Sequence, residues 1–436
     1  MEILFTDALL LPMTEGKPRT FTGALGISGN RIELVSDSET ERAAFLAAHP
    51  DARVIDCRGK LVMPGLVDTH CHAGMTLQRS YADDRALMEW LNDCIWPFEA
   101  HQTPDDIALG MTLGIVELLL GGVTSFVDMY FHESRCVEVV HRLGIRALLG
   151  CSYFDRSIDD VLRDAEQAMS NSAGCDRVSV AIAPHSGYTC SPDNLVRGKE
   201  FCRCNDLMFM SHIAETMDES RIIGELYGRT PVRHFESLGL LDDRTIAAHC
   251  VYVDDEDIAV LAERGVVVSH NPQSNMKLSS GVAPVWPMMQ AGVHMTVGTD
   301  GTCSNNDLDM FEELRTAVFL QKSATGDPTS LPAYEALKTV TVNGARAMGY
   351  ADGELGVLRK GALADVIVID LQKPHLQPVH DLVSNLVYCG KASDVETVVV
   401  NGEPVVENRR IRGVDLPEFY RNVSNAVSRI LTACKR

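Results

Sequence analysis

Eight short runs of apolar residues recur through the middle of the chain, separated by longer stretches that suit helices. Each run is nearly continuous in apolar residues and rich in β-branched side chains, which is typical of a strand buried on both faces. The runs cover residues 61–68, 122–129, 145–150, 177–185, 206–215, 244–250, 265–271 and 292–300. Amphipathic stretches such as Thr103–Leu120 and Asp307–Gln321 are candidate helices. Eight strand–helix units in a row favour an α/β fold with a closed (β/α)8 TIM barrel over an open sheet.

Both ends of the chain show short alternating strands joined by tight turns. Gly29-Asn30 marks one hairpin turn and Asn401-Gly402 marks another. Neither end is long enough to form a robust domain alone, so we expect the two to pack together. The predicted organisation is a composite β-sandwich with a C-terminal helix from residues 1–58 and 361–436, beside a metal-dependent barrel from residues 59–360.

The net charge, the cysteine pattern and the lack of long apolar runs limit which partners and which compartment we expect for this protein. A net charge of −21 over 436 residues repels phosphate backbones, so we expect no nucleic-acid polymer as a partner. The 13 cysteines form no CxxC motif and fit reduced thiols in a cytoplasmic protein. No basic leader and no apolar run of about 18 residues is present, so we predict no signal peptide and no membrane partner. We also expect a homo-oligomer.

Histidines and carboxylates gather where the predicted strands end, which is the catalytic edge of a TIM barrel. A single buried histidine is more often a satisfied core residue, but this joint pattern is hard to explain by packing, because buried polar groups cost free energy unless paired or metal-bound. The residues at these ends are His70, His72, His185, His212, Glu215, His249, His270 and Asp300.

Four of these residues form a candidate metal site. His70 and His72 lie two apart on a strand and therefore face the same side. Together with His212 and Asp300 they suit Zn²⁺ or Fe²⁺ with an open position for water. We therefore predict one divalent metal ion, zinc first and iron as the alternative. Such an ion lowers the pKa of its bound water to about 7 and so supplies hydroxide.

The remaining strand-end groups suit proton transfer. Glu215 lies three residues past His212 and could shuttle a proton, while His249 could orient the hydroxide and stabilise an oxyanion. Asp300 could accept the proton of the water while it binds the metal. We therefore expect Glu215, His249 and Asp300 to be catalytic.

The motifs HCH, HIAE, AAHC and GTDGTCSNN resemble the amidohydrolase superfamily. The longer segments PGLVDTHCHAGMTLQRSYADDRALMEWL, FVDMYFHE and SHNPQSNMKLSSGVAPV look like the methylthioadenosine/S-adenosylhomocysteine deaminases and related chlorohydrolases, over about residues 50–370. The resemblance implies that the substrate pocket is lined by Trp90, Glu99, His185 and Ser304. It places Glu99 on ribose hydroxyls and His185 on the purine. Binuclear relatives carry a bridging lysine at the fourth strand, and no lysine lies between Arg177 and Arg197, which supports one metal.

One position departs from the family pattern. Relatives that accept S-adenosylhomocysteine carry an arginine just past the third strand, where this chain has Cys151, and Arg156 is near but not equivalent. We therefore expect an adenosine analogue without a carboxylate-bearing tail, or another aminated heterocycle, as the substrate.

Several features have two interpretations. Trp90 is either a pocket wall or a helix anchor, and Asn271, Asn275 and Lys277 form either a substrate loop or a turn held by asparagine side chains. His234-Phe-Glu236 matches half of a cytidine-deaminase signature, but no P-C-x-x-C follows, so we interpret it as a chance match on a helix.

The leading functional hypothesis is a hydrolase of C–N bonds in cyclic amidines. In it, a metal-bound hydroxide attacks the amino-bearing carbon of an aminopurine nucleoside or related heterocycle and ammonia leaves. The alternative is a chlorohydrolase or aminohydrolase of triazine-like rings, since the same hydroxide serves either leaving group. A non-catalytic scaffold on the same barrel would show lost ligands, whereas every ligand position is occupied here.

Overall fold

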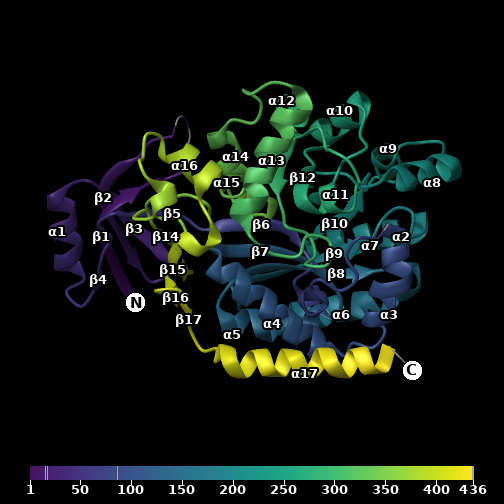
Figure 1. Cartoon of the computed structure of the whole chain (residues 1–436), viewed down its shortest axis with the longest axis horizontal. Coiled ribbons are helices and arrows are strands. Elements are labelled where there is room, and N and C mark those ends of the chain that lie inside the picture. Colours follow the sequence, from purple (N-terminus) through teal and green to yellow (C-terminus); the bar gives the residue numbers. More distant parts are fainter. Residues whose placement is uncertain (15, 17, 86, 435–436) are drawn as a thin grey trace.

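A computed structural model of the chain describes residues 1–14, 16, 18–85 and 87–434. Eight parallel strands form a nearly closed barrel, with helices around it (Figure 1). In spatial order around the barrel the strands are β6 (Leu66–Cys71), β7 (Val123–Tyr130), β8 (Arg146–Tyr153), β9 (Val178–Pro184), β10 (Met208–Ile213), β11 (Thr245–His249), β12 (Val267–His270) and β13 (His294–Val297). A bridge between Cys71 and Asp300 brings the first and last strands together. The predicted TIM-type barrel is thus confirmed.

Helices follow the strands and cover the outside of the barrel. The principal ones are α4 (Pro104–Leu120), α5 (Glu133–Leu143), α6 (Ile158–Asn171), α7 (Pro192–Asn205), α8 (Met217–Tyr227), α9 (Pro231–Ser237), α10 (Asp255–Arg264), α11 (Pro272–Lys277), α12 (Val285–Gln290), α13 (Met310–Thr325), α14 (Ala333–Thr339) and α15 (Val342–Ala347). Between β6 and α4 lie η1 (Ala73–Gln78), α2 (Leu87–Trp90), η2 (Leu91–Ile95) and α3 (Trp96–Glu99). Within the described residues, no helix is long and apolar enough to cross a bilayer.

The first apolar run, predicted as one barrel strand over 61–68, is two strands. Its first half, β5 (Lys60–Pro64), pairs with β1 and β14 of the second sheet, and β6 begins at Leu66. Gly65 stands between them, where an added Cβ would lie 2.1 Å from Thr124 Oγ1. Apolar periodicity could not reveal this break, because both halves are buried.

The strands of the two chain ends form one continuous mixed sheet beside the barrel (Figure 1). The predicted turns at Gly29-Asn30 and Asn401-Gly402 are present between β2 and β3 and between β15 and β16. The sheet contains β1 (Glu2–Leu10), β2 (Phe21–Ser28), β3 (Arg31–Ser36), β4 (Arg53–Asp56), β5, β14 (Val366–Asp370), β15 (Val395–Val400), β16 (Glu403–Glu407) and β17 (Arg410–Ile411). Two helices accompany it, α1 (Glu39–Ala48) and α16 (Leu382–Cys389).

The C-terminal helix α17 (Leu416–Cys434) runs along the outside of the barrel beneath α3 and α4 (Figure 1). Its Ile430 is fully buried against Leu77 and Phe98, and Arg429 pairs with Asp106. The predicted helix is therefore present, and it supports the segment between β6 and α4.

A buried ion pair joins the barrel to the mixed sheet. The guanidinium of Arg146, on β8, donates two hydrogen bonds of 2.9 Å to the Asp365 carboxylate, and each side chain is 1% exposed. Removing one partner of such a pair leaves the other charge buried and unpaired, which typically costs about 3–5 kcal/mol.

We therefore expect Asp365→Ala to lower the free energy of unfolding by about 3–5 kcal/mol in urea titrations. The matched control is Glu138→Ala, which removes a carboxylate that is 79% exposed and pairs with Arg135. The control should change stability by no more than about 1 kcal/mol. Equal effects from both variants would contradict a structural role for the buried pair.

Candidate active site

The carboxyl ends of the barrel strands bring the predicted histidines and Asp300 together. Two overlapping sets of donor atoms are present, and the atoms within each set lie within 4.8 Å of one another. The first set comes from His70, His212 and His249, and the second from His70, His72 and Asp300. Asp300 Oδ1 lies 3.1 Å from His72 Nε2 and 3.6 Å from His70 Nε2. The four predicted ligands therefore share one site, and His249 stands close enough to be a fifth donor.

Hydrogen bonds fix the orientation of three of the four candidate ligands. His212 Nδ1 lies 2.7 Å from the backbone oxygen of His185, and His72 Nδ1 bonds the backbone oxygen of Met129. Ser274 Oγ donates to Asp300 Oδ2 at 2.5 Å. Because these contacts occupy the Nδ1 atoms, the Nε2 atoms of both histidines are left to face the cavity.

The donor set fits a divalent cation. His70 Nε2 is buried and has no hydrogen-bond partner among the described residues, which is costly unless another group binds it. Burial lowers the pKa of His70 to about 4, so the ring is neutral and can donate its lone pair to a metal. Neutral imidazoles with one carboxylate are the ligands that zinc commonly has in proteins. The cluster is thus a histidine-rich metal site.

Glu215 lies beside this cluster, on the loop after β10. Its carboxylate is 15% exposed and lies 4.0 Å from His249 Nε2. Burial raises the pKa of the Glu215 carboxyl. The buried side chain of Glu219, on α8, accepts hydrogen bonds from the backbone nitrogens of Ala214 (3.1 Å) and Glu215 (2.8 Å). Glu219 is a positioning residue that the sequence patterns did not suggest.

His249 is held by a neighbour from the next loop. Its Nδ1 lies 2.9 Å from Asn275 Oδ1 on α11, and Asn271 donates to the backbone oxygen of Gly298. Lys277 pairs with Asp83 at 2.7 Å. Of the two interpretations of these residues, the asparagines therefore stabilise the local backbone and His249. His270, at the end of β12, is fully buried outside the pocket lining.

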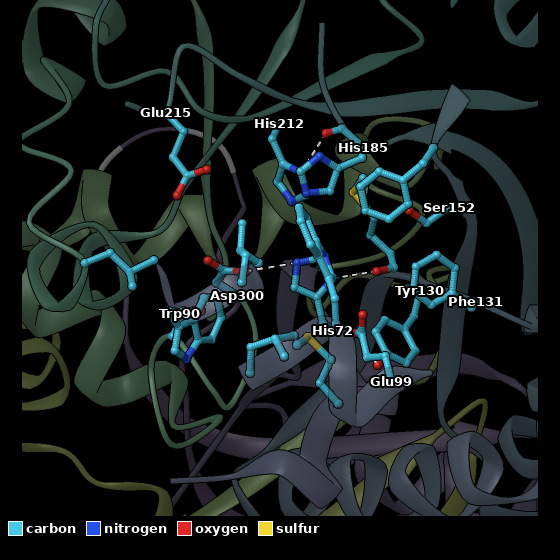
Figure 2. Close-up of a pocket in the computed structure, with 18 of the residues that line it drawn as sticks. His72, Trp90, Glu99, Tyr130, Phe131, Ser152, His185, His212, Glu215 and Asp300 are labelled. Carbon is cyan, nitrogen blue, oxygen red and sulfur yellow. Dashed lines mark hydrogen bonds and ion pairs between the residues drawn. The ribbon is translucent and has the colours of Figure 1, made fainter. Parts of the chain in front are cut away.

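The metal cluster forms one wall of a pocket of about 710 Å³, measured with its open mouth. Trp90, Glu99, His185 and Ser304 all line it, as the resemblance implied. Figure 2 shows Glu215 and Glu99 on opposite sides of this cavity. The Glu99 carboxylate accepts a hydrogen bond of 2.7 Å from the Tyr130 hydroxyl, and burial raises the pKa of Glu99 to about 7.

Several aromatic residues of the lining were not predicted from the sequence. Phe154 stacks on His185 with ring centroids 4.7 Å apart, and Trp96 and Phe131 lie beside Phe154. Their only sequence signal is the position of Phe131 and Phe154 directly after β7 and β8. Trp90 itself is both buried and part of the pocket wall, so both of its interpretations hold.

Cys151 does not lie just past the third strand, so it cannot support the expectation of a substrate without a carboxylate-bearing tail. Cys151 lies within β8, which runs to Tyr153, and its side chain is buried in the hydrophobic core, away from the pocket. The residues of this region that reach the pocket are Ser152 and Phe154, and Arg156 is exposed. The composition of the pocket, and not position 151, must therefore indicate which substrates fit. His234, in contrast, lies on α9 as expected.

Comparison with known proteins identifies relatives along the whole chain. The chain is 42% identical to a 5-methylthioadenosine/S-adenosylhomocysteine deaminase of Desulforamulus reducens over 98% of this chain and 99% of the relative. An adenosine deaminase from Xanthomonas campestris with bound zinc is 34% identical, with a TM-score of 0.95 and coverage of 99% and 98%. An atrazine chlorohydrolase from Arthrobacter aurescens, complexed with zinc, is 25% identical, with a TM-score of 0.87 and coverage of 98% and 100%.

The profile of the amidohydrolase family matches residues 61–405. That span contains the entire barrel and every residue of the metal cluster. The chain belongs to the amidohydrolase family.

Proposed function

We propose that this protein hydrolytically deaminates an adenosine nucleoside or a close analogue, taking up water and releasing ammonia. The observation that carries the proposal is one pocket in which a histidine-rich metal site, the carboxyl of Glu215 and the carboxylate of Glu99 face the same space. The relative at 42% identity is named for this reaction on 5-methylthioadenosine and S-adenosylhomocysteine.

The cofactor we propose is one divalent ion, zinc, held by His70, His72, His212 and Asp300. When bound, such an ion supplies an ionised water as the nucleophile at neutral pH. Zinc in the similar Xanthomonas and Arthrobacter structures supports this choice. The position of His249 Nε2, 4.0 Å from the Glu215 carboxylate, favours a proton-transfer role for His249 over a ligand role.

Glu215 and His249 divide the proton transfers in this proposal. Burial raises the pKa of the Glu215 carboxyl, which favours its protonated form, and in that form it can donate to the ring nitrogen next to the amino-bearing carbon. The resulting carboxylate can then take the proton of the hydroxyl that has added to the ring carbon and pass it to the departing amine, which leaves as ammonia while the carbonyl forms. His249 Nδ1 faces an amide oxygen and so carries the hydrogen, which leaves Nε2 of the neutral ring free to accept a proton. The resulting imidazolium can donate to the developing oxyanion.

The substrate-binding side of the pocket supports a nucleoside. One oxygen of Glu99 accepts from Tyr130, and the carboxylate lines the pocket, where it can also accept from ribose hydroxyls. His185 lines the same pocket, where its ring can contact the base.

The second candidate function is hydrolytic displacement from a triazine-like ring, which the fold similarity to the atrazine chlorohydrolase favours. The lower identity of 25%, against 42% for the deaminase, and the carboxylate of Glu99 support the nucleoside instead. A non-catalytic scaffold is not supported, because all four predicted ligands lie in the cluster.

An ammonia-release screen tests the proposal. We expect the zinc-loaded protein to release ammonia from adenosine nucleosides, measured alongside guanine, pterins and chlorinated triazines. Chloride release from the triazines, with no ammonia from any nucleoside, would favour the second candidate.

Glu215→Gln removes the proton-transfer group and keeps its size. We expect it to bind the metal as the parent does and to lower kcat by about 10²-fold or more, the usual contribution of a general acid–base. Metal content by elemental analysis and steady-state kinetics measure the two effects separately. A variant with nearly full kcat would show that Glu215 does not transfer the proton.

His70→Ala removes a proposed metal ligand. His249→Gln replaces the imidazole beside the proposed ligands with an amide of similar size. We expect the first to lose most of its bound metal, and the second to keep one equivalent while losing turnover. Elemental analysis after dialysis against a weak chelator gives the metal content. Loss of metal in His249→Gln to the same extent would identify His249 as a ligand.

A further inference from the structure

We propose that the pocket selects adenosines whose 5′ substituent is small and uncharged, and discriminates against those with an amino-acid tail. This inference rests on the proposed function, since it concerns which nucleoside is deaminated. It follows from the side chains that surround the part of the pocket next to the ribose-binding carboxylate.

An aromatic wall begins beside Glu99. Tyr130, which donates to Glu99, has its ring centroid 5.0 Å from that of Phe131. The ring centroid of Phe154 lies 6.2 Å from that of Phe131 and 6.0 Å from that of Trp96. The 5′ carbon of a nucleoside is attached to the ribose, so a ribose bound at Glu99 places its 5′ substituent within reach of this wall.

The lining of the pocket offers no lysine or arginine to a substrate carboxylate. Among the described residues that line it there is no lysine or arginine, and its ionisable acids are Glu99, Glu215 and Asp300. A homocysteine tail carries both a carboxylate and an ammonium group. The ammonium could pair with an acid here, but the carboxylate would be buried without a partner, which costs more than an unpaired neutral group.

The cations of the adjoining outer hollow already have partners. This hollow shares Tyr188 and Leu278 with the pocket. Lys277 donates to Asp83 Oδ1 at 2.7 Å and to the backbone oxygen of Cys303 at 2.8 Å. Arg85 and Arg221 also line the hollow and pair with Glu89 and Glu225. Reaching a carboxylate in the pocket would require them to leave these partners.

An apolar substituent fits the same wall favourably. A methylthio group has no hydrogen-bonding requirement, and its apolar surface gains free energy when it leaves water for this wall. Sulfur also packs well against aromatic rings. The wall therefore favours 5′-methylthio and 5′-deoxy nucleosides over the amino-acid conjugate.

The experiment measures kcat/KM of the zinc-loaded protein for 5′-methylthioadenosine, 5′-deoxyadenosine and S-adenosylhomocysteine. We expect S-adenosylhomocysteine to be at least about tenfold worse than the methylthio compound, because of its unpaired carboxylate. Equal values would overturn the inference and leave the proposed function intact. Absence of deamination of all three would instead refute the proposed function.

A second measurement uses Phe154, which lies at the pocket just after β8 and can be replaced without removing a ligand or an acid–base group. Phe154→Arg supplies a cation and should raise the ratio of kcat/KM for S-adenosylhomocysteine over 5′-methylthioadenosine by at least about tenfold. The matched control, Phe154→Leu, keeps the site apolar and should leave this ratio within about threefold of the parent. Unchanged metal content verifies that both variants are folded. No change in the ratio for Phe154→Arg would overturn the inference.

Discussion

The side chain of Asp68 joins the first and last strands of the barrel. Its fully buried carboxylate accepts hydrogen bonds from the backbone nitrogen and hydroxyl of Thr299, at 3.1 and 2.6 Å, and from His70 N at 3.3 Å. The backbone nitrogen of Asp300 then donates to His70 O at 2.8 Å. At Gly298, an added Cβ would lie 2.6 Å from two backbone atoms of His70, so the close approach needs glycine. The contacts that close the barrel are the same ones that set two metal ligands side by side.

Around this junction of the first and last strands, the site is built in two layers. Strand ends supply the groups that face the cavity, and the short helices that follow supply the groups that orient them. Glu219 fixes the backbone of Glu215, Asn275 holds His249, and Ser274 holds Asp300. Each supporting group comes from α8 or α11, within one or two turns after a strand. Preorganisation of this kind allows the site groups to keep their orientation without substrate.

The barrel and the grouping of the four candidate ligands could be predicted from the sequence because each depends on a local pattern. Apolar runs identify strands, and residues at the ends of parallel strands must meet at one edge, so His70, His72, His212 and Asp300 were found without any distance information. Contacts between distant segments have no such pattern. The aromatic wall joins Trp96, Phe131 and Phe154 from three separate segments of the chain. The position of Cys151 depended on a strand ending three residues later than its apolar run suggested. The number of metal ions and the homo-oligomer remain predictions.

The direct passage from β5 into β6 ties the two bodies of the protein together at residue 65. The backbone belongs to the mixed sheet up to Pro64 and to the barrel from Leu66. The remaining strands of the mixed sheet come after the barrel in the sequence. No single cut in the chain can therefore release an intact barrel. The side chains of β5 pack in the sheet while His70 and His72 follow within eight residues, so a shift of the sheet would be transmitted along β6 to the ligands themselves. Recombination between relatives would have to exchange both chain ends together to preserve this geometry.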